Sequence, residues 1–426
     1  MSTAELRQRP VAKDDVPAPN LAAGITPSDD EKKKEAHPSG KAQHGPIFSA
    51  LRALTFGIYF ATSCIVCVIR IHITQILGCP LYLLNRDFYY AYMALTKQSF
   101  GLLGTTMTHW WAPTKIRVSG DASVAGQLSI TPDGRIECAF PERLVMIANH
   151  QIYTDWLYLW WVGYTNNPAM HGHLYIILKE SLKYIPVIGP GCLLFGFIFM
   201  SRKMATDQPR LAHRLQKLRK KVISPDGEEF LNPMWLLLFP EGTNLSNNGR
   251  AKSAKWAEKT GVKDPRHLLL PRSTGTFFCL NELQETVEYV YDCTVAYEGI
   301  PRGGYGEEYF TLSSTYFRGR PPKSVNFYWR RFALADMPLD DEEKFSKWMQ
   351  DRWYEKDDLL EQYISTGRFP ANGAGIKGHI ETEVRTRHWW EFIKIFIMLG
   401  AFGLTFRLIL QALNSLQSWA ASRVNN

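Results

Sequence analysis

The chain has few of the features that mark secreted or disulfide-bonded proteins. Its seven cysteines are odd in number and scattered, and several lie inside apolar runs, among them Cys64, Cys67 and Cys192. This distribution is typical of reduced, buried thiols in a protein that faces the cytosol. Cys64 and Cys67 form a C-x-x-C pair, but they lie in an apolar helical stretch, so we interpret both as lipid-facing or core thiols.

Motifs for metals and nucleic acids are also missing. His171 and His173 have no cysteine or carboxylate cluster to match them, so we expect no metal site. The net charge of +8 comes without a DNA- or RNA-binding motif, so we expect no nucleic-acid partner. The positive charge then favours anionic lipid or a phosphorylated small molecule. An aromatic content of 13% favours a membrane interface, where amphipathic rings settle at headgroup depth.

The first 46 residues lack both apolar periodicity and the pattern of a signal peptide. They mix Pro, Ala, Lys and Asp, with no cationic start followed by an apolar core. We therefore predict that residues 1–46 are a disordered leader. The sequence shows no internal repeat.

An apolar region follows this leader. From Ala53 to Asn85 the only formal charge is Arg70, which favours membrane association over a buried soluble hairpin. One tilted span and two helices entering one leaflet are both compatible with the pattern. The aromatic stretch that follows has a weakly amphipathic, interfacial character. We assign residues 47–113 to membrane-anchoring and interfacial helices.

From residue 114 short apolar runs alternate with helical stretches such as 207–222. The strand-like runs are 143–149, 173–179, 197–202, 235–240, 267–271, 293–297 and 324–332. Continuous apolar strands separated by helices indicate an α/β domain with a mixed, mostly parallel sheet flanked by helices. We assign residues 114–336 to this domain. In this fold class the chemistry lies at the carboxyl ends of the strands.

Two helical segments complete the chain. The stretch 340–364 begins with acidic residues suited to a helix N-terminus, and we assign 337–388 to an amphipathic helical extension. Residues 389–426 are predicted to form an apolar helix and a tail. The apolar run 395–406 has twelve residues, too few to span a membrane alone.

The segment Asn149–Asp155, "NHQIYTD", follows an apolar strand. With eleven histidines, one His-x4-Asp spacing is expected by chance at nearly even odds. The spacing alone therefore does not show that the two residues act together, and the surrounding sequence must be considered. Across a strand-to-helix turn the Asp155 carboxylate can hold an imidazole nitrogen of His150 and support the imidazolium formed on proton transfer. Because no serine or cysteine motif lies nearby, a substrate hydroxyl would take the nucleophile's place.

Three other predicted strands also end in polar residues. "FPEGT" contains Glu241, Gly242 and Thr243, and its glycine permits a tight turn; alone it could be any loop. "IFMSRK" ends a predicted strand with Arg202 and Lys203. Arginine is suited to bidentate phosphate binding, although a surface charge pair is an equally good interpretation of these residues alone. "LLPRSTG" contains Pro271 and Arg272 before a predicted helix.

These four segments together resemble the signature blocks of the glycerophospholipid acyltransferase superfamily, which includes the 1-acylglycerol-3-phosphate acyltransferases. The blocks occupy 149–155, 199–202, 239–243 and 269–275. The resemblance extends from about residue 114 to 370. It is closest to the lysocardiolipin and lysophosphatidylinositol acyltransferase branch, on stretches such as "LKESLKYIPVIG" and "YDCTVAYEGIP".

The resemblance implies a role for each residue. His150 would be the general base, Asp155 would orient it, and Arg202 would hold the acceptor phosphate. Glu241 and Gly242 would shape the acceptor site. Further substrate-binding residues are expected from the same segments and from one neighbouring strand end: Asn149, Thr243, Pro271, Arg272 and Lys179.

We therefore expect a membrane-bound enzyme that moves a fatty acyl group from acyl-CoA to a lysophospholipid hydroxyl. The acceptor would be lysophosphatidylinositol, lysocardiolipin or lysophosphatidic acid. Acyl-CoA would be a co-substrate, with no cofactor and no metal. The membrane would be the endoplasmic reticulum, with the site facing the cytosol. A CoA-independent phospholipid transacylase and a non-catalytic membrane adaptor are the alternatives, and release of free CoA distinguishes them.

Overall fold

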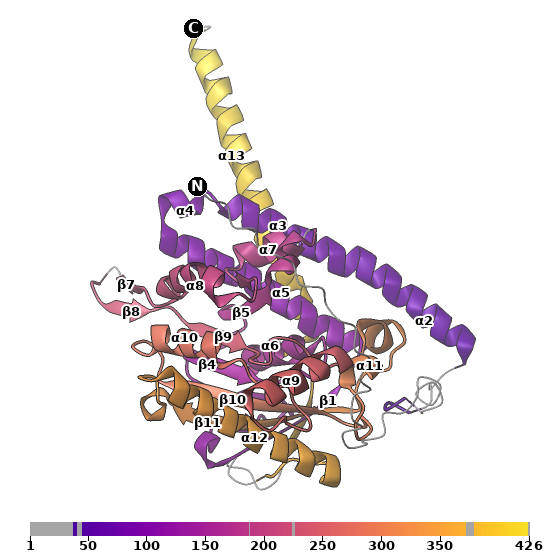
Figure 1. Cartoon of the computed structure of the whole chain (residues 1–426). Coiled ribbons are helices and arrows are strands. Elements are labelled where there is room, and N and C mark those ends of the chain that lie inside the picture. Colours follow the sequence, from indigo (N-terminus) through magenta and orange to yellow (C-terminus); the bar gives the residue numbers. More distant parts are fainter. Residues whose placement is uncertain (1–36, 41–44, 187, 224–225, 372–378, 425–426) are drawn as a thin grey trace, which may run out of the picture. The chain divides into compact units, whose positions relative to one another are not determined.

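The apolar runs form one eight-stranded sheet in a computed structural model that describes residues 37–40, 45–186, 188–223, 226–371 and 379–424 (Figure 1). The strand order is β12-β1-β11-β10-β4-β9-β5-β6. Five neighbouring pairs are parallel, while β10 with β11 and β1 with β12 are antiparallel. The predicted mixed, mostly parallel α/β sheet is therefore confirmed.

The strands of the main sheet are β1 (Lys115–Gly120), β4 (Arg143–Ala148), β5 (Leu174–Lys179), β6 (Ile198–Met200), β9 (Met234–Leu238), β10 (Tyr289–Tyr297), β11 (Ser324–Ala333) and β12 (Ile380–Glu383). Two small hairpins lie outside it, β2 (Leu128–Ile130) with β3 (Ile136–Cys138) and β7 (Lys221–Ile223) with β8 (Glu229–Leu231). Because β4, β9, β5 and β6 are all parallel, their carboxyl ends lie along one edge.

Helices cover both faces of the sheet. Side chains alternate along β4, with Leu144 and Met146 in the core on one face and Val145 and Ile147 in the core on the other. The first core also contains residues of α5 (Arg86–Trp111) and α6 (Asp155–Thr165). The second contains residues of α8 (Met204–Leu218), α10 (Ser273–Leu283) and α12 (Glu342–Thr366). Burial on both faces explains why these strands are continuously apolar.

The predicted run 267–271 is not a strand, although its residues are apolar. Its backbone N–H groups are taken by side chains and not by a neighbouring strand. His267 N donates to Asp357 Oδ1 at 2.6 Å, and Leu270 N donates to Ser253 Oγ at 3.0 Å. The segment therefore crosses the end of the sheet as an extended loop that leads into α10.

The apolar N-terminal region is a long helix that runs through α2 (Pro46–Tyr59), the π-helical turn η1 (Phe60–Ile65), α3 (Val66–Gly78) and α4 (Leu81–Leu84). In the part of the chain that the structure describes, Pro46–Leu84 is the one helix found long and apolar enough to cross a membrane, by length and composition. It packs against α5, against the short helix α7 (Ile188–Leu194) and against the turn η4 (Ser313–Phe317).

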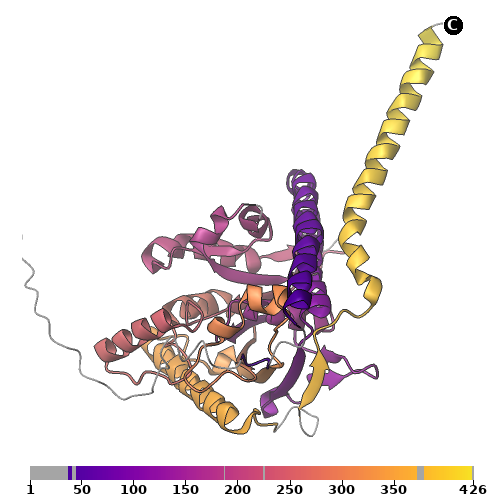
Figure 2. The ribbon, with the colours of Figure 1, turned by 90° about the vertical axis from the view of Figure 1, so that its right-hand side faces the viewer.

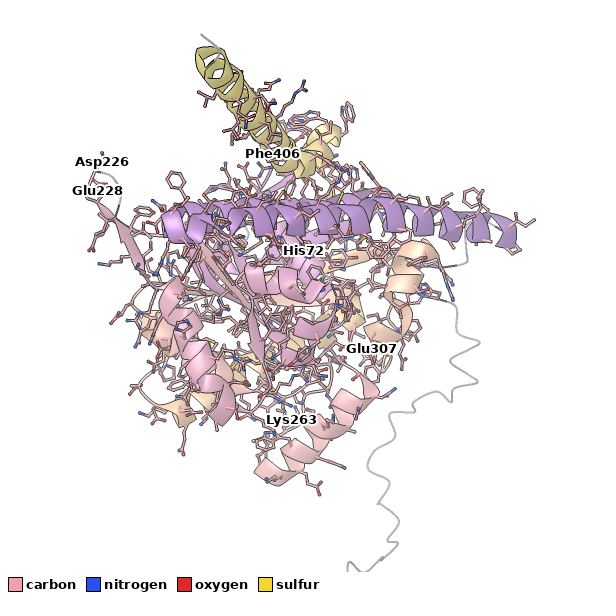
Figure 3. All side chains as sticks on the ribbon, turned by 90° about the horizontal axis from the view of Figure 1, so that it is seen from above. His72, Asp226, Glu228, Lys263, Glu307 and Phe406 are labelled. Atoms are coloured by element: carbon pink, nitrogen blue, oxygen red, sulfur yellow. The ribbon has the colours of Figure 1, made fainter. Side chains whose placement is uncertain are left out.

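Three polar residues of this helix, Arg70, His72 and Gln75, lie on the side that faces other protein segments. His72 Nδ1 is 2.8 Å from Gln75 Oε1, and a Cβ added to Gly191 of α7 would lie 1.7 Å from the His72 ring (Figure 3). The guanidinium of Arg70 lies 4.9 Å from the ring centre of Phe396. These three side chains therefore help to fix the helix to the protein, and the exposed side of the helix is mostly apolar.

Helix α5 is more deeply buried than an interfacial segment requires. Ten of its residues are buried, Lys97 among them. At Gly101 a Cβ would lie 2.4 Å from Nε1 of Trp160, so this glycine permits the close approach of α5 to α6. The helix therefore forms part of the core on its face of the sheet.

The C-terminal region contains α13 (Lys394–Val424), which is longer than the twelve-residue apolar run from which we predicted it. Its start packs against α3 and α5, and the rest extends away from the sheet (Figure 2). Large apolar side chains are exposed along it, among them Leu404, Phe406, Leu408, Ile409 and Leu413.

Most of the predicted leader lies outside the described residues, but His37–Gly40 is described and docks on the protein. Nδ1 of His37 accepts the N–H of Ser39, so Nε2 carries the proton and donates to the carbonyl of Tyr309 at 3.1 Å. The hydroxyl of Ser39 donates to the carbonyl of Pro321. The prediction of a disordered leader is therefore wrong for this short segment.

Candidate active site

The turn between β4 and α6 brings His150 and Asp155 together. β4 ends at Ala148 and α6 begins at Asp155. His150 Nδ1 and Asp155 Oδ2 are 2.8 Å apart, the carboxylate is fully buried, and 19% of the histidine side chain is exposed. The prediction that these two side chains meet across a strand-to-helix turn is confirmed.

The surroundings of Asp155 define which nitrogen of His150 is basic. Oδ2 also accepts the N–H groups of Gln151 at 2.6 Å and Ile152 at 3.0 Å, and Oδ1 accepts the hydroxyl of Tyr297. Burial, and then the charge of Asp155, raise the pKa of Tyr297 well above its usual value, so the phenol stays a donor. A carboxylate with these partners accepts the Nδ1 proton, which leaves Nε2 of His150 as the basic nitrogen.

Asn149 has a structural role that we did not predict. We expected it among the substrate-binding residues, but the side chain is completely buried. Its Nδ2 donates to the carbonyl of Val295 at 2.9 Å and its Oδ1 accepts the N–H of Val295 at 2.8 Å. The carboxamide thus extends the β4–β10 pairing by one step and fixes the start of the turn that carries His150, whose ring stacks on Phe239 at 4.4 Å.

Glu241 connects two of the polar segments. Its Oε1 accepts the backbone N–H of His150 at 2.8 Å, and its Oε2 accepts that of Leu269 at 3.0 Å. Burial raises the pKa of Glu241 to about 7, although both N–H groups lower it. We expected Glu241 to shape the acceptor site, and that role stays a prediction. The contacts show that Glu241 joins the backbone of two segments of the site.

Arg202 lies beyond the end of β6, in a strained backbone conformation. β6 ends at Met200, and the φ of Arg202 is 69°, a left-handed conformation otherwise seen only at glycines among the described residues. Asp207 holds this conformation, because its two oxygens accept the N–H groups of Ser201 at 3.0 Å and Lys203 at 3.2 Å. Because the strand has ended and the backbone turns at Arg202, the alternation of side chains along a strand does not determine the direction of the Lys203 side chain.

A second guanidinium lies near Arg202. Partial burial, and then the like charge of Arg272, lower the pKa of Arg202. Gly242 has a φ of 72°, and a Cβ there would lie 3.4 Å from Cδ and Nε of Arg272. Among the described residues no carboxylate forms an ion pair with either arginine. Two guanidiniums that are near enough to repel each other and have no carboxylate partner among the described residues are suited to a phosphate group.

The remaining predicted residues lie at the same edge. Lys179 is the last residue of β5, is exposed, and pairs with Met200 of β6 in the sheet. Thr243 follows Gly242 in the loop after β9, and Pro271 immediately precedes Arg272. The backbone N–H of Arg272 donates to the carbonyl of Pro240 at 2.8 Å, which joins these two loops.

Four polar residues of the site were not predicted from the sequence. Tyr297 reaches Asp155 from β10, and Asn244 donates from Nδ2 to Glu307 of α11 (Gly306–Tyr309). No local spacing indicates these contacts, because their partners are distant in sequence. The role of Asp207 was predictable from the sequence, since an acidic residue in the first turn of a predicted helix is positioned to accept backbone N–H groups.

This geometry is suited to group transfer onto a hydroxyl, and sequence comparisons identify such a family of enzymes. A buried carboxylate holds a partly exposed histidine whose other nitrogen is free, at the sheet edge that also carries two guanidiniums. This arrangement is suited to removing a proton from a hydroxyl near a phosphate. Residues 127–298 match the family described as Acyltransferase, and residues 315–398 match the family described as Acyltransferase C-terminus.

Individual relatives cover most of the chain. An uncharacterized acyltransferase of Schizosaccharomyces pombe is 37% identical over 78% of this chain and 90% of its own length. The 2-acyl-1-lysophosphatidylinositol acyltransferase of Saccharomyces cerevisiae is 40% identical over 64% of this chain and 75% of its own. A crystal structure of the 1-acyl-sn-glycerophosphate acyltransferase PlsC of Thermotoga maritima matches with a TM-score of 0.40 and 14% identity, over 74% of this chain and 97% of that one. The chain belongs to the acyltransferase family.

Proposed function

We propose that this protein is an acyl-CoA-dependent lysophospholipid acyltransferase that works at a membrane surface. The observation that carries the proposal is the His150–Asp155 pair, joined at 2.8 Å. Within the described residues no protein group is hydrogen-bonded to Nε2 of His150. The nitrogen is therefore free to accept a proton from a substrate hydroxyl, which takes the place that a serine has in a hydrolase.

The proposed reaction needs no metal or redox cofactor. Nε2 of His150 takes the proton of the acceptor hydroxyl, while the oxygen of that hydroxyl forms a bond to the thioester carbonyl carbon. The carbon–sulfur bond then breaks, and the CoA thiolate takes the proton back from the imidazolium. Asp155 supports the transient positive charge because its carboxylate is held by four donors and cannot turn away.

The arginine pair supplies the site for the acceptor. A lysophospholipid has its phosphate a few bonds from the free glycerol hydroxyl, so guanidiniums that clamp the phosphate also place the hydroxyl. We assign this role to Arg202, with Arg272 as its neighbour. Lysophosphatidylinositol is the acceptor that we propose first, because a relative 40% identical is named for it. Lysocardiolipin and lysophosphatidic acid are the next acceptors to test.

The long N-terminal helix supplies the membrane contact in this proposal. Eight of its exposed large apolar side chains follow one another at intervals of three, four or seven residues: Ile47, Leu51, Leu54, Ile58, Ile65, Ile69, Ile73 and Ile76. Such a stripe marks one side of a helix. At 1.5 Å per residue the 39-residue helix is about 58 Å long, about twice a bilayer core. We propose that it lies along the membrane with this stripe in the lipid, at the cytosolic face of the endoplasmic reticulum.

Release of free CoA tests the proposed function. The purified full chain in phospholipid vesicles is mixed with oleoyl-CoA, with and without lysophosphatidylinositol, and both free thiol and diacyl product are measured. We expect thiol and product in equal amounts, only when the lysolipid is present. Product without thiol release would identify a phospholipid as the donor, and absence of product with all three lysolipids would refute the proposal.

A further inference from the structure

A carboxylate outside the recognised segments lies close to the turn that carries the proposed base. Glu307 belongs to α11, which falls between the two matched family regions, 127–298 and 315–398 (Figure 3). The packing of Gly306 brings α11 close to the His150 turn. A Cβ on that glycine would lie 2.6 Å from Cγ2 of Ile152 and 3.4 Å from the carbonyl oxygen of Gln151.

Two side-chain hydrogen bonds fix α11 to the loop after β9. Nδ2 of Asn244 donates to Oε2 of Glu307, and Nδ2 of Asn247 donates to Oε1 of Glu308 at 3.1 Å. The same loop is joined to the backbone of His150, because the N–H of Leu245 donates to the carbonyl of His150 at 2.7 Å. Glu307 is therefore positioned relative to His150 through one short chain of contacts.

The environment of Glu307 differs from that of the other two carboxylates near His150. Both oxygens of Asp155 and both of Glu241 accept protein hydrogen bonds, whereas Oε1 of Glu307 has no donor among the described residues. Glu307 is half-buried. Burial raises the pKa of Glu307, the bond from Asn244 lowers it, the charge of Glu308 raises it and the charge of His150 lowers it, so Glu307 and His150 are near enough to interact.

We infer that Glu307 is a positioning residue that acts through His150, by stabilising the imidazolium that forms when the base takes the acceptor proton. This inference rests on the proposed function. Charge is the relevant property, because Asp155 already holds Nδ1 and the direct hydrogen bond of Glu307 is to Asn244. A carboxylate at this place favours the charged form of the imidazole and costs nothing to reorganise during the reaction.

The test separates charge from structure with three variants. Glu307→Gln keeps an oxygen that accepts from Asn244 but removes the charge, whereas Glu307→Asp keeps the charge. Glu308→Gln is the matched control, since its partner is Asn247 and it is exposed. With oleoyl-CoA and lysophosphatidylinositol, we expect Glu307→Gln to lower kcat by about threefold to tenfold, as for one half-exposed charge acting on another.

The inference also requires that the KM of both substrates and the unfolding temperature stay at the parent values in Glu307→Gln. Glu307→Asp should recover most of kcat, and Glu308→Gln should stay within about twofold of the parent, as for a surface substitution. A Glu307→Gln enzyme with unchanged kcat, a loss confined to KM, or an equal loss in Glu307→Asp and Glu307→Gln would each overturn the inference. An inactive parent enzyme would refute the proposed function instead, so the two failures are distinct.

Discussion

At the scale of single residues, buried carboxylates that accept backbone N–H groups hold the site together. Asp155 accepts two such groups in the His150 turn, Glu241 accepts one from each of two segments, and Asp207 accepts two beside Arg202. Each carboxylate fixes a stretch of backbone that carries a functional side chain. A carboxylate replaced by an amide in these positions would present a donor to another donor, which costs about 1–3 kcal/mol.

The first prediction concerns the pair itself. Changing His150 to Ala should abolish transfer while the unfolding temperature stays near that of the parent, because the imidazole is partly exposed. Asp155→Asn should lose nearly as much activity, since an amide cannot both orient the imidazole and support its charge. It should also be less stable, because its amide faces the N–H groups of Gln151 and Ile152. Initial rates and thermal unfolding of both variants check this, and a His150→Ala rate within tenfold of the parent would contradict the mechanism.

The second prediction concerns the arginine after β6. Arg202→Lys should be markedly impaired and Arg202→Ala nearly inactive, with little change in apparent affinity for acyl-CoA, because Lys keeps the charge but loses the planar fork. Arg202 has a φ of 69°, which is unfavourable for lysine and alanine alike, so comparing the two variants isolates the effect of the head group. Rates are measured against lysophospholipid concentration at fixed acyl-CoA.

The control for this prediction is Lys203→Ala. Lys203 is exposed, and its backbone N–H, which alanine keeps, makes the bond to Asp207. Alanine there should therefore be tolerated. If Lys203→Ala were the damaging change and Arg202→Ala a mild one, the phosphate site would lie elsewhere, with Lys179 or Arg272 as the next residues to test.

The sequence predicted the local part of the site and missed the part that depends on distant contacts. His150 and Asp155 lie five positions apart across one turn, so their meeting followed from the predicted strand and helix. The buried role of Asn149 was missed because its partner, Val295, lies on another strand. Glu307 was missed for the same reason, since only the folded chain brings α11 to the His150 turn.

At the scale of elements, a buried ion cluster joins α12 to the sheet. Asp292 of β10 contacts Lys356 of α12 at 2.5 Å and Arg330 of β11 at 2.7 Å, and all three side chains are almost fully buried. The cluster links the two family regions, because Asp292 lies in the first and the two cations lie in the second. α12 itself was predicted correctly, and the side chain of Asp341 caps its start.

The third prediction is that Asp292→Asn destabilises the protein by about 3–5 kcal/mol, because two buried cations lose their shared counter-ion. Burial by itself would raise the pKa of Asp292, but Lys356 and Arg330 together bring it below the usual value. Its stabilising effect is therefore complete above the ordinary aspartate pKa and is lost as the pH falls through the lower folded value. Thermal unfolding against pH measures both effects, and the exposed Asp340→Asn should change stability by less than about 0.5 kcal/mol. Equal stability of the two variants would contradict a role for the cluster.

Strand and helix predictions succeeded where apolar pattern alone determines the element. The apolar runs that became β4, β5, β9, β10 and β11 all pair in the main sheet. The run 267–271 has the same composition but became a loop, because Asp357, Glu241 and Ser253 take its backbone donors. Those acceptors come from three distant segments, so composition could not reveal them.

At the scale of the whole molecule, the apolar stripe of the N-terminal helix and the exposed side chains of α13 give the chain two surfaces suited to lipid. The sequence predicted apolar segments in both places but left open how the first one meets a membrane. The structure describes one long helix fixed to the protein through side chains such as His72 and Gln75, with its apolar stripe on the other side. That arrangement favours a helix in the plane of one leaflet over a span.

The last prediction concerns this attachment. Alkaline carbonate should not strip the full-length protein from membranes, because the stripe buries apolar side chains in lipid and does not depend on charge. Deleting residues 1–36 should leave attachment and activity unchanged, since neither the stripe nor the docked segment His37–Gly40 is removed. Deleting residues 1–44 should leave attachment intact but lower activity, because His37 then no longer holds Tyr309 at the end of α11. Fractionation and initial rates of the three proteins check this. Recovery of the full chain in the soluble fraction would contradict the attachment, and equal activity of the two truncated proteins would contradict the role of the docked segment.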